Sequence, residues 1–424
     1  MRILYPQSLH PIFMKLITHG IEPVIVGGFV RDAILGRESH DIDIELYNLN
    51  SFTYLETLLK SFGSANSVGK SFGVCKLNYK NLELDFSLPR RDSKIDKGHQ
   101  GFHIELDTSL DFKTAASRRD FTINAVGYDV KNQKFLDPFH GIEDIKKAYL
   151  RAVDLKKFDE DPLRVLRAIM FHARFQFQLE NKLFLKCKEM MQKNVLQELP
   201  RERIFEEMKK ILLQSKKPSL GFLLLKQLDG FIFFHEFQSL KESQYKKILQ
   251  SLDILQNYKI TSYEDTLAIS LALLTSKFTP KEQKSFLDKL TQSKKLRTKI
   301  DTLTQTQCPL ESYNNYNIYK LATKVDIALY ANYCNALMHE KEKEKITLLV
   351  QKAKKLGVLH TKSKPLITGK MLLAYNITPS KKYSKILDDA YEAQLREEFK
   401  NTKEAAIWLS HYIDSKSESN FPCK

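Results

Sequence analysis

The sequence has no closely spaced cysteine pair, no long apolar run and no internal repeat. Its five cysteines are scattered without a CxxC motif, which indicates a reducing, cytoplasmic setting and argues against a structural zinc site. Charged residues such as Lys226 and Asp229 interrupt the apolar stretches, so no membrane span is expected. Residues 1–13 lack the long apolar core of a signal peptide. We therefore expect a soluble cytoplasmic protein.

Acidic side chains are outnumbered by basic ones. The 424 residues include 51 Asp and Glu against 67 Lys and Arg, which gives a formal net charge of +16 and a pI near 9.3. This surplus favours a polyanionic partner, nucleic acid above all, although many lysines merely solvate a surface. The length predicts roughly two to four domains, and no segment indicates an obligate protein partner.

The first candidate site begins at VIVGGFVRD, residues 24–32. The apolar run at its start predicts a buried strand. The break at Gly27 and Gly28 leaves a backbone without side chains, which can approach a phosphate closely. Arg31 opens a segment with helical apolar periodicity. Together these residues predict a phosphate-binding turn, and the alternative is an ordinary loop glycine.

Asp41 and Asp43 are two residues apart in DIDI, where polar and apolar residues alternate. On a strand such residues share a face. Two carboxylates this close repel each other, and a pair of divalent ions relieves the repulsion and can clamp the attacking and leaving oxygens of a phosphoryl transfer. Asp85, on the second strand of a hairpin predicted over residues 67–86, could complete the site. The alternative is a set of solvated or half-exposed strand aspartates.

A second cluster of charged residues lies in SRRDFTINAVGYD, residues 117–129. The fork of an arginine such as Arg119 suits triphosphate oxygens, and the carboxylate of Asp120 can accept from a ribose hydroxyl. The alternative is an internal arginine–aspartate pair that steadies the domain. Between the two clusters, residues 89–111 are charged and unpatterned and predict a long loop.

A helix is predicted from Pro162, with Asp161 as its N-cap. Its apolar residues recur at helical spacing and form a core stripe, made of Leu163, Leu166, Met170 and Ala173. Arg164 and Arg167 fall on another face. Asp161 and Arg164 can lie side by side, where the carboxylate could accept from the amino group of cytosine or adenine while the guanidinium donates to the ring. Guanine and uracil would present a carbonyl there and be rejected. The alternative is that Asp161 only caps the helix and Arg164 is only a surface charge.

Downstream, Arg203 and Glu207 are four residues apart and can pair on one helix face, which we interpret as scaffold. Residues 214–218, QSKKP, predict a domain boundary. Beyond it the pattern is helical and lysines crowd the exposed positions, including Lys370, Lys381 and Lys382 near the end. Helices with lysine faces are consistent with holding an RNA backbone without reading its sequence, and plain solvated helices are the alternative.

Several motifs resemble, in the same order, those of the class II CCA-adding enzymes, which share a polymerase-β-like nucleotidyltransferase head with bacterial poly(A) polymerases. They are GGFVRDAILG with DIDIE, RRDFTINA, EDPLR and ELPRERIFEEMKKIL, and a weaker likeness covers the C-terminal segment. The resemblance implies an α+β fold, in which a head with a mixed sheet and helices is followed by an all-α neck, body and tail. The implied domains are a catalytic head over residues 1–136, a nucleotide-selecting neck over 137–215, an RNA-binding body over 216–360 and a tRNA-binding tail over 361–424.

The resemblance also implies an activity, the addition of C, C and A to the tRNA 3′ end from CTP and ATP without a nucleic-acid template and with release of pyrophosphate. Asp41 and Asp43 would hold two Mg²⁺ ions, and Asp85 would assist in catalysis. The residues implied to bind the nucleotide are Gly27, Gly28, Arg31, Arg119, Asp120, Asp161, Arg164 and Arg167. The partner would be tRNA, held at its acceptor stem and elbow, and the loop over residues 89–111 would help to position the primer during the last addition.

The same motifs are also compatible with other functions. A poly(A) polymerase, a CC-adding enzyme or an A-adding enzyme would share them, and a catalytically silent RNA-binding protein on this scaffold is the alternative from another class. One departure is Met170, where many relatives carry a further arginine one turn beyond Arg167. No His-Asp pair stands in the context of a phosphohydrolase, so we expect no appended phosphatase domain.

Overall fold

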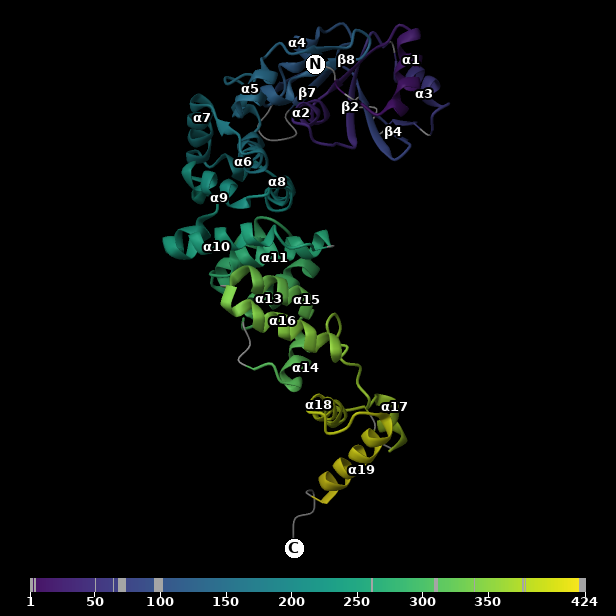
Figure 1. Ribbon diagram of the computed structural model, residues 1–424, viewed down its shortest axis with the longest axis vertical. Helices are drawn as coiled ribbons and strands as arrows, with labels where there is room; N and C mark the ends of the chain where they lie inside the picture. The colour runs from purple at the N-terminus through teal and green to yellow at the C-terminus, as the bar shows by residue number, and fades with distance from the viewer. Residues whose placement is uncertain are drawn as a thin grey trace. The chain divides into compact units, whose positions relative to one another are not determined.

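The computed structural model describes most of the chain (Figure 1). The described residues are 3, 5–49, 51–63, 65–67, 74–94, 102–260, 262–308, 312–338, 340–375, 377 and 379–418. The chain divides into two compact units. The first contains residues 1–240 and 281–291, and the second contains residues 241–280 and 292–424. All of the predicted site residues lie in the first unit.

The first unit begins with a seven-stranded mixed sheet in the order β3-β4-β5-β2-β1-β8-β9. The central strand β2 is antiparallel to β1 and parallel to β5. Its first residues alternate between the two faces of the sheet. Ile42 and Ile44 are fully buried on one face, and Asp41 and Asp43 are exposed on the other. The strands are β1 (Glu22–Val26), β2 (Asp41–Tyr47), β3 (Ala65–Ser67), β4 (Val74–Tyr79), β5 (Leu82–Ser87), β8 (Gly127–Asp129) and β9 (Lys134–Leu136).

Helices pack on the apolar face of this sheet. They form one hydrophobic core with Ile42 and Ile44 and are α1 (His10–Thr18), α2 (Gly28–Ile34) and α3 (Phe52–Leu59). The other face carries a smaller cluster, in which Phe112, the first residue of α4 (Phe112–Ala116), packs against Val24 and Val26. The sheet with helices on one face confirms the predicted α+β head, and the partial cover on the other face leaves the aspartates exposed.

Two of the antiparallel strand pairs in this region bear on the predictions. β4 pairs with β5 through the two-residue turn Lys80-Asn81, and both residues have positive φ, as a type I′ turn requires. The hairpin predicted over residues 67–86 is therefore confirmed in its described part, and residues 68–73 lie outside the described residues. β6 (Arg90–Lys94) pairs with β7 (Phe102–Leu106). The predicted unpatterned loop is thus wrong on both sides of residues 95–101, which are not described. Residues 102–106 alternate between apolar and polar side chains, as is typical of a strand, and they form a backbone ladder with residues 90–94.

The rest of the first unit is mainly helical. α6 (Leu163–Phe175) packs against α8 (Arg201–Gln214) and α9 (Pro218–Gln227). The predicted core stripe of α6 is confirmed, since its four residues are buried, and Met170 packs in this core with 3% of its surface exposed. Because α9 packs on α6 and α8, the first unit continues past residue 215, and the four-domain division stays a prediction. The remaining elements are α5 (Gly141–Lys147), α7 (Asn181–Gln192), α12 (Pro280–Asp288), β10 (Tyr149–Leu150) and β11 (Gln178–Leu179).

The described residues of the second unit are helical, which confirms the all-α second half. α11 packs against α10, α13 and α15, and α17 to α19 form a separate hydrophobic cluster around Leu372 and Leu409. Within the described ranges, no helix is both long and apolar enough to cross a membrane. The helices are α10 (Glu242–Leu255), α11 (Tyr263–Thr275), α13 (Lys294–Gln305), α14 (Asn315–Lys324), α15 (Ile327–Leu337), α16 (Glu340–Lys355), α17 (Gly369–Ala374), α18 (Lys381–Leu395) and α19 (Thr402–Glu418).

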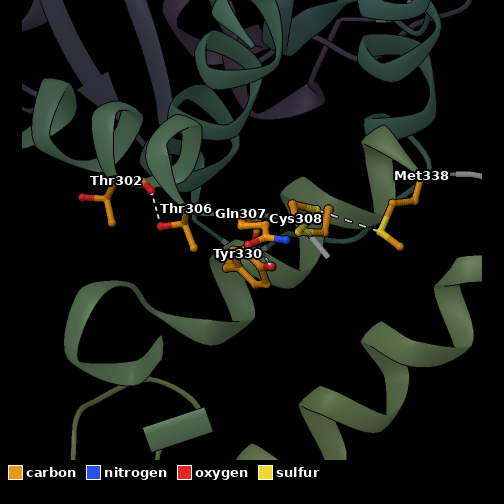
Figure 2. The surroundings of a disulfide bond; sticks show 7 residues. Thr302, Thr306, Gln307, Cys308, Tyr330 and Met338 are labelled. Carbon is orange, nitrogen blue, oxygen red and sulfur yellow. Dashed lines mark hydrogen bonds between the residues drawn. A yellow bond between two sulfur atoms is a disulfide. The ribbon is translucent and has the colours of Figure 1, made fainter. Parts of the chain in front are cut away.

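Two cysteines that are far apart in the sequence meet in the second unit (Figure 2). Cys308, just after α13, forms a disulfide with Cys334 of α15, 26 residues away, and their Cα atoms are 5.9 Å apart. The hydroxyl of Tyr330 on the same helix donates to the carbonyl of Gln307 at 2.6 Å and holds the same turn. The scattered cysteine positions did not predict this bond, because helix packing decides which distant residues meet.

Candidate active site

The predicted acidic residues meet on the exposed face of the sheet. Asp41 and Asp43 lie on β2, and Asp85 lies opposite Asp43 on β5 in the parallel register. Asp85 accepts a hydrogen bond from Nζ of Lys76 at 2.7 Å and is therefore ion-paired. Among the residues that the structure describes, no three His, Cys, Asp or Glu side chains are arranged to hold a metal ion. Asp41 and Asp43 are thus the candidate metal-binding pair, and the catalytic role of Asp85 stays a prediction.

The electrostatics of the two β2 aspartates suit a cation. Although both keep exposed atoms, displacement of water by the surrounding protein raises the pKa of Asp41 and of Asp43. The charge of Asp85 raises the pKa of Asp41 further. At Asp43, Arg119 lowers the pKa and Asp41 raises it, and the net shift is upward. A divalent cation between the carboxylates would remove this repulsion, so the pair fits a magnesium site.

Gly27 forms the neighbouring side of this site. It follows β1 with φ +72° and ψ −135°, a conformation that favours glycine. A Cβ atom here would lie 3.0 Å from Oδ2 of Asp43 and 3.2 Å from Nη1 of Arg119. Residues from three separate motifs therefore meet at this point, where the lack of a side chain lets Asp43 and Arg119 lie close to the backbone. Gly28 follows as the first residue of α2.

Glu45 holds the arginine pair and was not singled out from the sequence. It lies two residues beyond Asp43 on the same face of β2, but it is buried. Its Oε1 accepts from Arg118 at 2.9 Å and lies 4.0 Å from Arg119, while Oε2 accepts from the hydroxyl of Tyr47 at 2.9 Å. Burial lowers the pKa of Arg119, the charge of Arg118 lowers it further, and Glu45 offsets part of the shift. The sequence did contain a signal for Glu45, since it is the third acidic residue of DIDIE and continues the alternation of acidic and apolar residues.

Arg31 points into the interior of the first unit. It is 5% exposed, and it donates through Nε to Asp32 at 2.9 Å and through Nη1 to Asn124 at 2.7 Å. Its guanidinium also lies over the rings of Phe171 and Phe175. Burial is the main cause of its lowered pKa, against which Asp32 acts. Arg31 therefore links α2 to the RRDFTINA motif, and its contact with a triphosphate stays a prediction.

Asp120 is the centre of a hydrogen-bond network. Its Oδ1 accepts from Nδ2 of Asn124 at 2.9 Å and from the backbone N–H of Phe121 at 2.8 Å, and its Oδ2 accepts from Nε of Arg167 at 2.5 Å. Burial by itself would raise the pKa of Asp120, but Arg167 and these hydrogen bonds outweigh burial and hold the pKa below its usual range. An internal pair is thus present, with Arg167 as the partner, and the contact of Asp120 with a ribose stays a prediction.

Asp161 and Arg164 lie together at the start of α6, but each has another partner. Asp161 accepts from Nη1 and Nη2 of Arg203 at 3.4 and 3.2 Å, and from the backbone N–H of Leu163 at 3.1 Å. Arg164 donates to two backbone carbonyls at 2.8 and 3.2 Å. A carboxylate has about four acceptor positions and a guanidinium has five N–H donors. Both side chains therefore keep the capacity to meet a base.

The predicted pair of Arg203 and Glu207 is wrong. Arg203 binds Asp161 instead, while Glu207 accepts from Lys210 at 2.7 Å and lies 4.0 Å from Arg167. Glu207 is 2% exposed, and its Oε2 has no hydrogen-bond partner among the described atoms. The physical reason is that α8 packs against α6, which brings Arg203 within reach of Asp161, while Lys210 on α8 itself pairs with Glu207. α8 thus supports the candidate site from behind α6.

Three protein-family descriptions match successive parts of the chain. Residues 24–151 match the Poly A polymerase head domain. Residues 176–238 match the probable RNA and SrmB-binding site of polymerase A, and residues 260–408 match the putative domain 2 of tRNA nucleotidyltransferase. The first match contains both β2 aspartates, both glycines and the RRDFTINA motif.

A CCA-adding enzyme of Lactococcus lactis subsp. lactis (strain IL1403) is 31% identical to this chain over 409 residues, which cover 94% of this chain and 95% of the relative. The chain belongs to the class II CCA-adding enzyme family. As a member of this family it is a nucleotidyltransferase enzyme, and its head and helical second half have the fold expected for the family.

Solved structures of CCA-adding enzymes share this fold. That of Thermotoga maritima complexed with tRNA has a TM-score of 0.66 at 22% identity and covers 97% of both chains. A complex of a CCA-adding enzyme with CTP has a TM-score of 0.68 at 21% identity and covers 97% of this chain and 96% of that chain. The likeness extends over the whole length, so the family assignment does not depend on the head alone.

Proposed function

We propose that the protein is a CCA tRNA nucleotidyltransferase that adds C, C and A to the 3′ end of tRNA from CTP and ATP without a nucleic-acid template. The observation that carries this proposal is the meeting of Gly27, Asp43 and Arg119 beside Asp41, in a chain that matches a CCA-adding enzyme along its length. The complexes of the structural neighbours with tRNA and with CTP support RNA and nucleotide as substrates.

In the proposed reaction, the 3′ hydroxyl oxygen of the RNA attacks the α-phosphorus of the nucleotide, and the bond from this phosphorus to the leaving pyrophosphate breaks. Asp41 and Asp43 would hold two Mg²⁺ ions, which when bound supply positive charge to the attacking and leaving oxygens. Gly27 would let a phosphate approach the backbone closely, and Arg119 would add positive charge on the same side. Asp85 would assist from the neighbouring strand after giving up its bond to Lys76.

Base choice would depend on the start of α6. Asp161 would accept from the amino group of cytosine or adenine, and Arg164 would donate to the ring, whereas the carbonyl of guanine or uracil would face the carboxylate. Arg203 holds the Asp161 carboxylate from α8 and leaves it an acceptor position for the base. Each unmatched buried polar group costs about 1–3 kcal/mol, so two mismatches are enough for strong rejection.

The second unit would hold the tRNA at its acceptor stem and elbow. Lys370 in α17 and Lys381 in α18 are exposed, as the sequence predicts, while the side chain of Lys382 lies outside the described residues. Exposed lysines can neutralise phosphates without reading the sequence. This part of the proposal rests on charge and on the family.

The activity is tested with tRNA that lacks the 3′-terminal CCA, incubated with each nucleoside triphosphate alone and in pairs. We expect CTP alone to add two residues and CTP with ATP to add three. Long tails from ATP alone on any RNA would instead show a poly(A) polymerase. A stop after two C residues, or addition only of A to a tRNA that ends in CC, would show an enzyme that makes part of the sequence.

The variant Asp41→Asn separates catalysis from RNA binding. We expect a loss of at least about 10³-fold in kcat with unchanged tRNA affinity, because Asp41 would act through the metal in the transition state. Glu22→Gln is the matched control, since Glu22 is a half-exposed strand carboxylate that is paired with Lys131 at 3.0 Å and has no role in the proposed reaction. Full activity of Asp41→Asn would contradict the mechanism, and an inactive wild-type protein that binds tRNA would favour the silent RNA-binding alternative.

A further inference from the structure

Three arginine side chains gather beside two phenylalanine rings of α6 in the first unit. Phe171 and Phe175 stack with their centroids 5.8 Å apart and their planes at 12°. The guanidinium of Arg31 lies 4.8 Å from the centroid of Phe175, and those of Arg37 and Arg174 lie 4.7 and 4.9 Å from it. Three cations therefore gather around one ring, each held by a cation–π contact.

The three guanidiniums differ in what else they bind. Arg31 is buried and donates to Asp32 and Asn124, and Arg174 lies 3.5 Å from Asp32. Among the described residues, Asp32 is the one carboxylate within ion-pair distance of these arginines. Within ion-pair distance, one carboxylate thus faces three guanidiniums, while the charge of Asp120 also acts on Arg31 and Glu38 lines the same hollow as Arg37.

Arg37 is the member of this cluster that is open to a ligand. It is exposed, and within the described part of the chain its guanidinium has no hydrogen-bond or ion-pair partner. Its position is nevertheless defined, because its backbone N–H donates to the carbonyl of Asp32 at 2.8 Å and its guanidinium rests on Phe175. It also lines a hollow of about 620 Å³, which leaves space beside it. An arginine that is held in place with its donors unused is prepared to bind an anion.

The position of Arg37 in the chain limits its distance from the proposed reaction. It lies in the short connection from α2 to β2, four residues before Asp41, which limits the distance between their Cα atoms to about 14 Å. Arg37 follows the C-terminal end of α2, whereas Gly27 and Gly28 are at its N-terminal end. A triphosphate beside Gly27 would be at the opposite end of this helix, so an anion at Arg37 is better supplied by the RNA chain that ends at the aspartates.

We propose that Arg37 binds a backbone phosphate of the RNA primer close to its 3′ end, with Phe175 as the support of the guanidinium. The inference rests on the proposed function, since it assigns a contact of the RNA substrate in that same site. Arg37 thereby becomes an RNA-positioning residue outside the motifs that the sequence analysis singled out.

The test compares Arg37→Gln with wild type in two measurements, the Kd for tRNA that lacks CCA as a function of salt and the KM for CTP. We expect the Kd for tRNA to rise about tenfold and the slope of log Kd against log salt to fall by about 0.7, the value for one phosphate contact on a single strand. The KM for CTP should stay within about twofold. Arg37→Lys should keep the salt slope, because it keeps the charge.

Lys131→Gln is the matched control, since it removes one exposed positive charge from the same unit, where Lys131 is paired with Glu22. It should leave the tRNA affinity unchanged. An unchanged Kd and salt slope in Arg37→Gln, or a rise in the KM for CTP alone, would overturn the proposal. Wild-type protein that adds no nucleotide would refute the proposed function instead, and the comparison of tRNA affinities would still decide the role of Arg37.

Discussion

At the scale of single residues, the polar groups of the site are largely bound to one another. Arg31 binds Asn124, Asn124 binds Asp120, and Asp120 binds Arg167, so one network joins α2, the RRDFTINA motif and α6. Buried charges of this kind are costly when one partner is removed. The network therefore ties α2, the RRDFTINA motif and α6 to one another.

Gly27→Ala tests the space beside Asp43. A Cβ at this position would press on Oδ2 of Asp43 and on Arg119, and alanine at φ +72° is also strained. We expect kcat to fall at least about tenfold, because a shift of reacting groups of well under 1 Å is enough for such a loss. Steady-state kinetics of nucleotide addition is the measurement.

Gly20→Ala is the control for the strain alone. Gly20 has φ +80°, but no atom lies within 4 Å of its Cβ position. Gly20→Ala should lose about 1 kcal/mol of unfolding free energy. Gly27→Ala should lose at least as much, because of its added contacts, and only Gly27→Ala should lose activity. Equal activity in the two variants would show that the space at Gly27 is not needed.

At the scale of elements, a strand and a helix pair carry the site. β2 presents Asp41 and Asp43 on one face because its apolar residues are buried on the other, and β5 adds Asp85 beside it. Asp161 lies just before α6, and α8 holds it through the two hydrogen bonds from Arg203. In the proposed reaction, base choice would thus depend on how these two helices pack.

Asp161→Ala is expected to relax base choice more than it weakens triphosphate binding. The ratio of kcat/KM for CTP to that for UTP should fall at least about tenfold, since one mismatch of about 1–3 kcal/mol is removed. The KM for CTP should change less than this ratio. An unchanged ratio would refute the role of Asp161 in base selection.

Arg203→Gln should also lower the ratio of kcat/KM for CTP to that for UTP, but by a smaller factor than Asp161→Ala. In this variant Asp161 remains but is no longer held from α8. Arg201→Gln is the matched control on the same helix, since Arg201 is exposed and lies 3.7 Å from Glu202. If Arg201→Gln changed the ratio as much as Arg203→Gln, the effect would come from the loss of any positive charge on α8 and not from the contact with Asp161.

At the scale of the whole molecule, the chain consists of two compact units. The first contains the candidate active site, and the second is the all-α part with exposed lysines in α17 and α18. The second unit also contains the disulfide, which joins the end of α13 to α15. Cys75 and Cys187 are buried and lie in the first unit.

The Cys308–Cys334 bond is expected to stabilise the oxidised protein. Closing a loop of 26 residues lowers the entropy of the unfolded chain and contributes about 3 kcal/mol to the free energy of unfolding of the second unit. Denaturant unfolding with and without reductant is the measurement. In Cys308→Ser, reductant should have no effect, and a wild-type curve that reductant leaves unchanged would contradict the prediction.

The sequence by itself determined the local features of this protein. Alternation in DIDI placed both aspartates on one strand face, the helical stripe of Leu163, Leu166, Met170 and Ala173 was buried as expected, and the ordered motifs were enough for the family. Such features depend on spacing along a strand or a helix, which the backbone imposes on any sequence.

Only the tertiary structure decided which distant residues meet. It paired Arg203 with Asp161 instead of Glu207, joined Cys308 to Cys334, and brought Arg37 onto Phe175. The partner of a charged or reactive side chain is the group that packing brings nearest, and that distance depends on how whole elements fit together. No spacing along the chain contains this information.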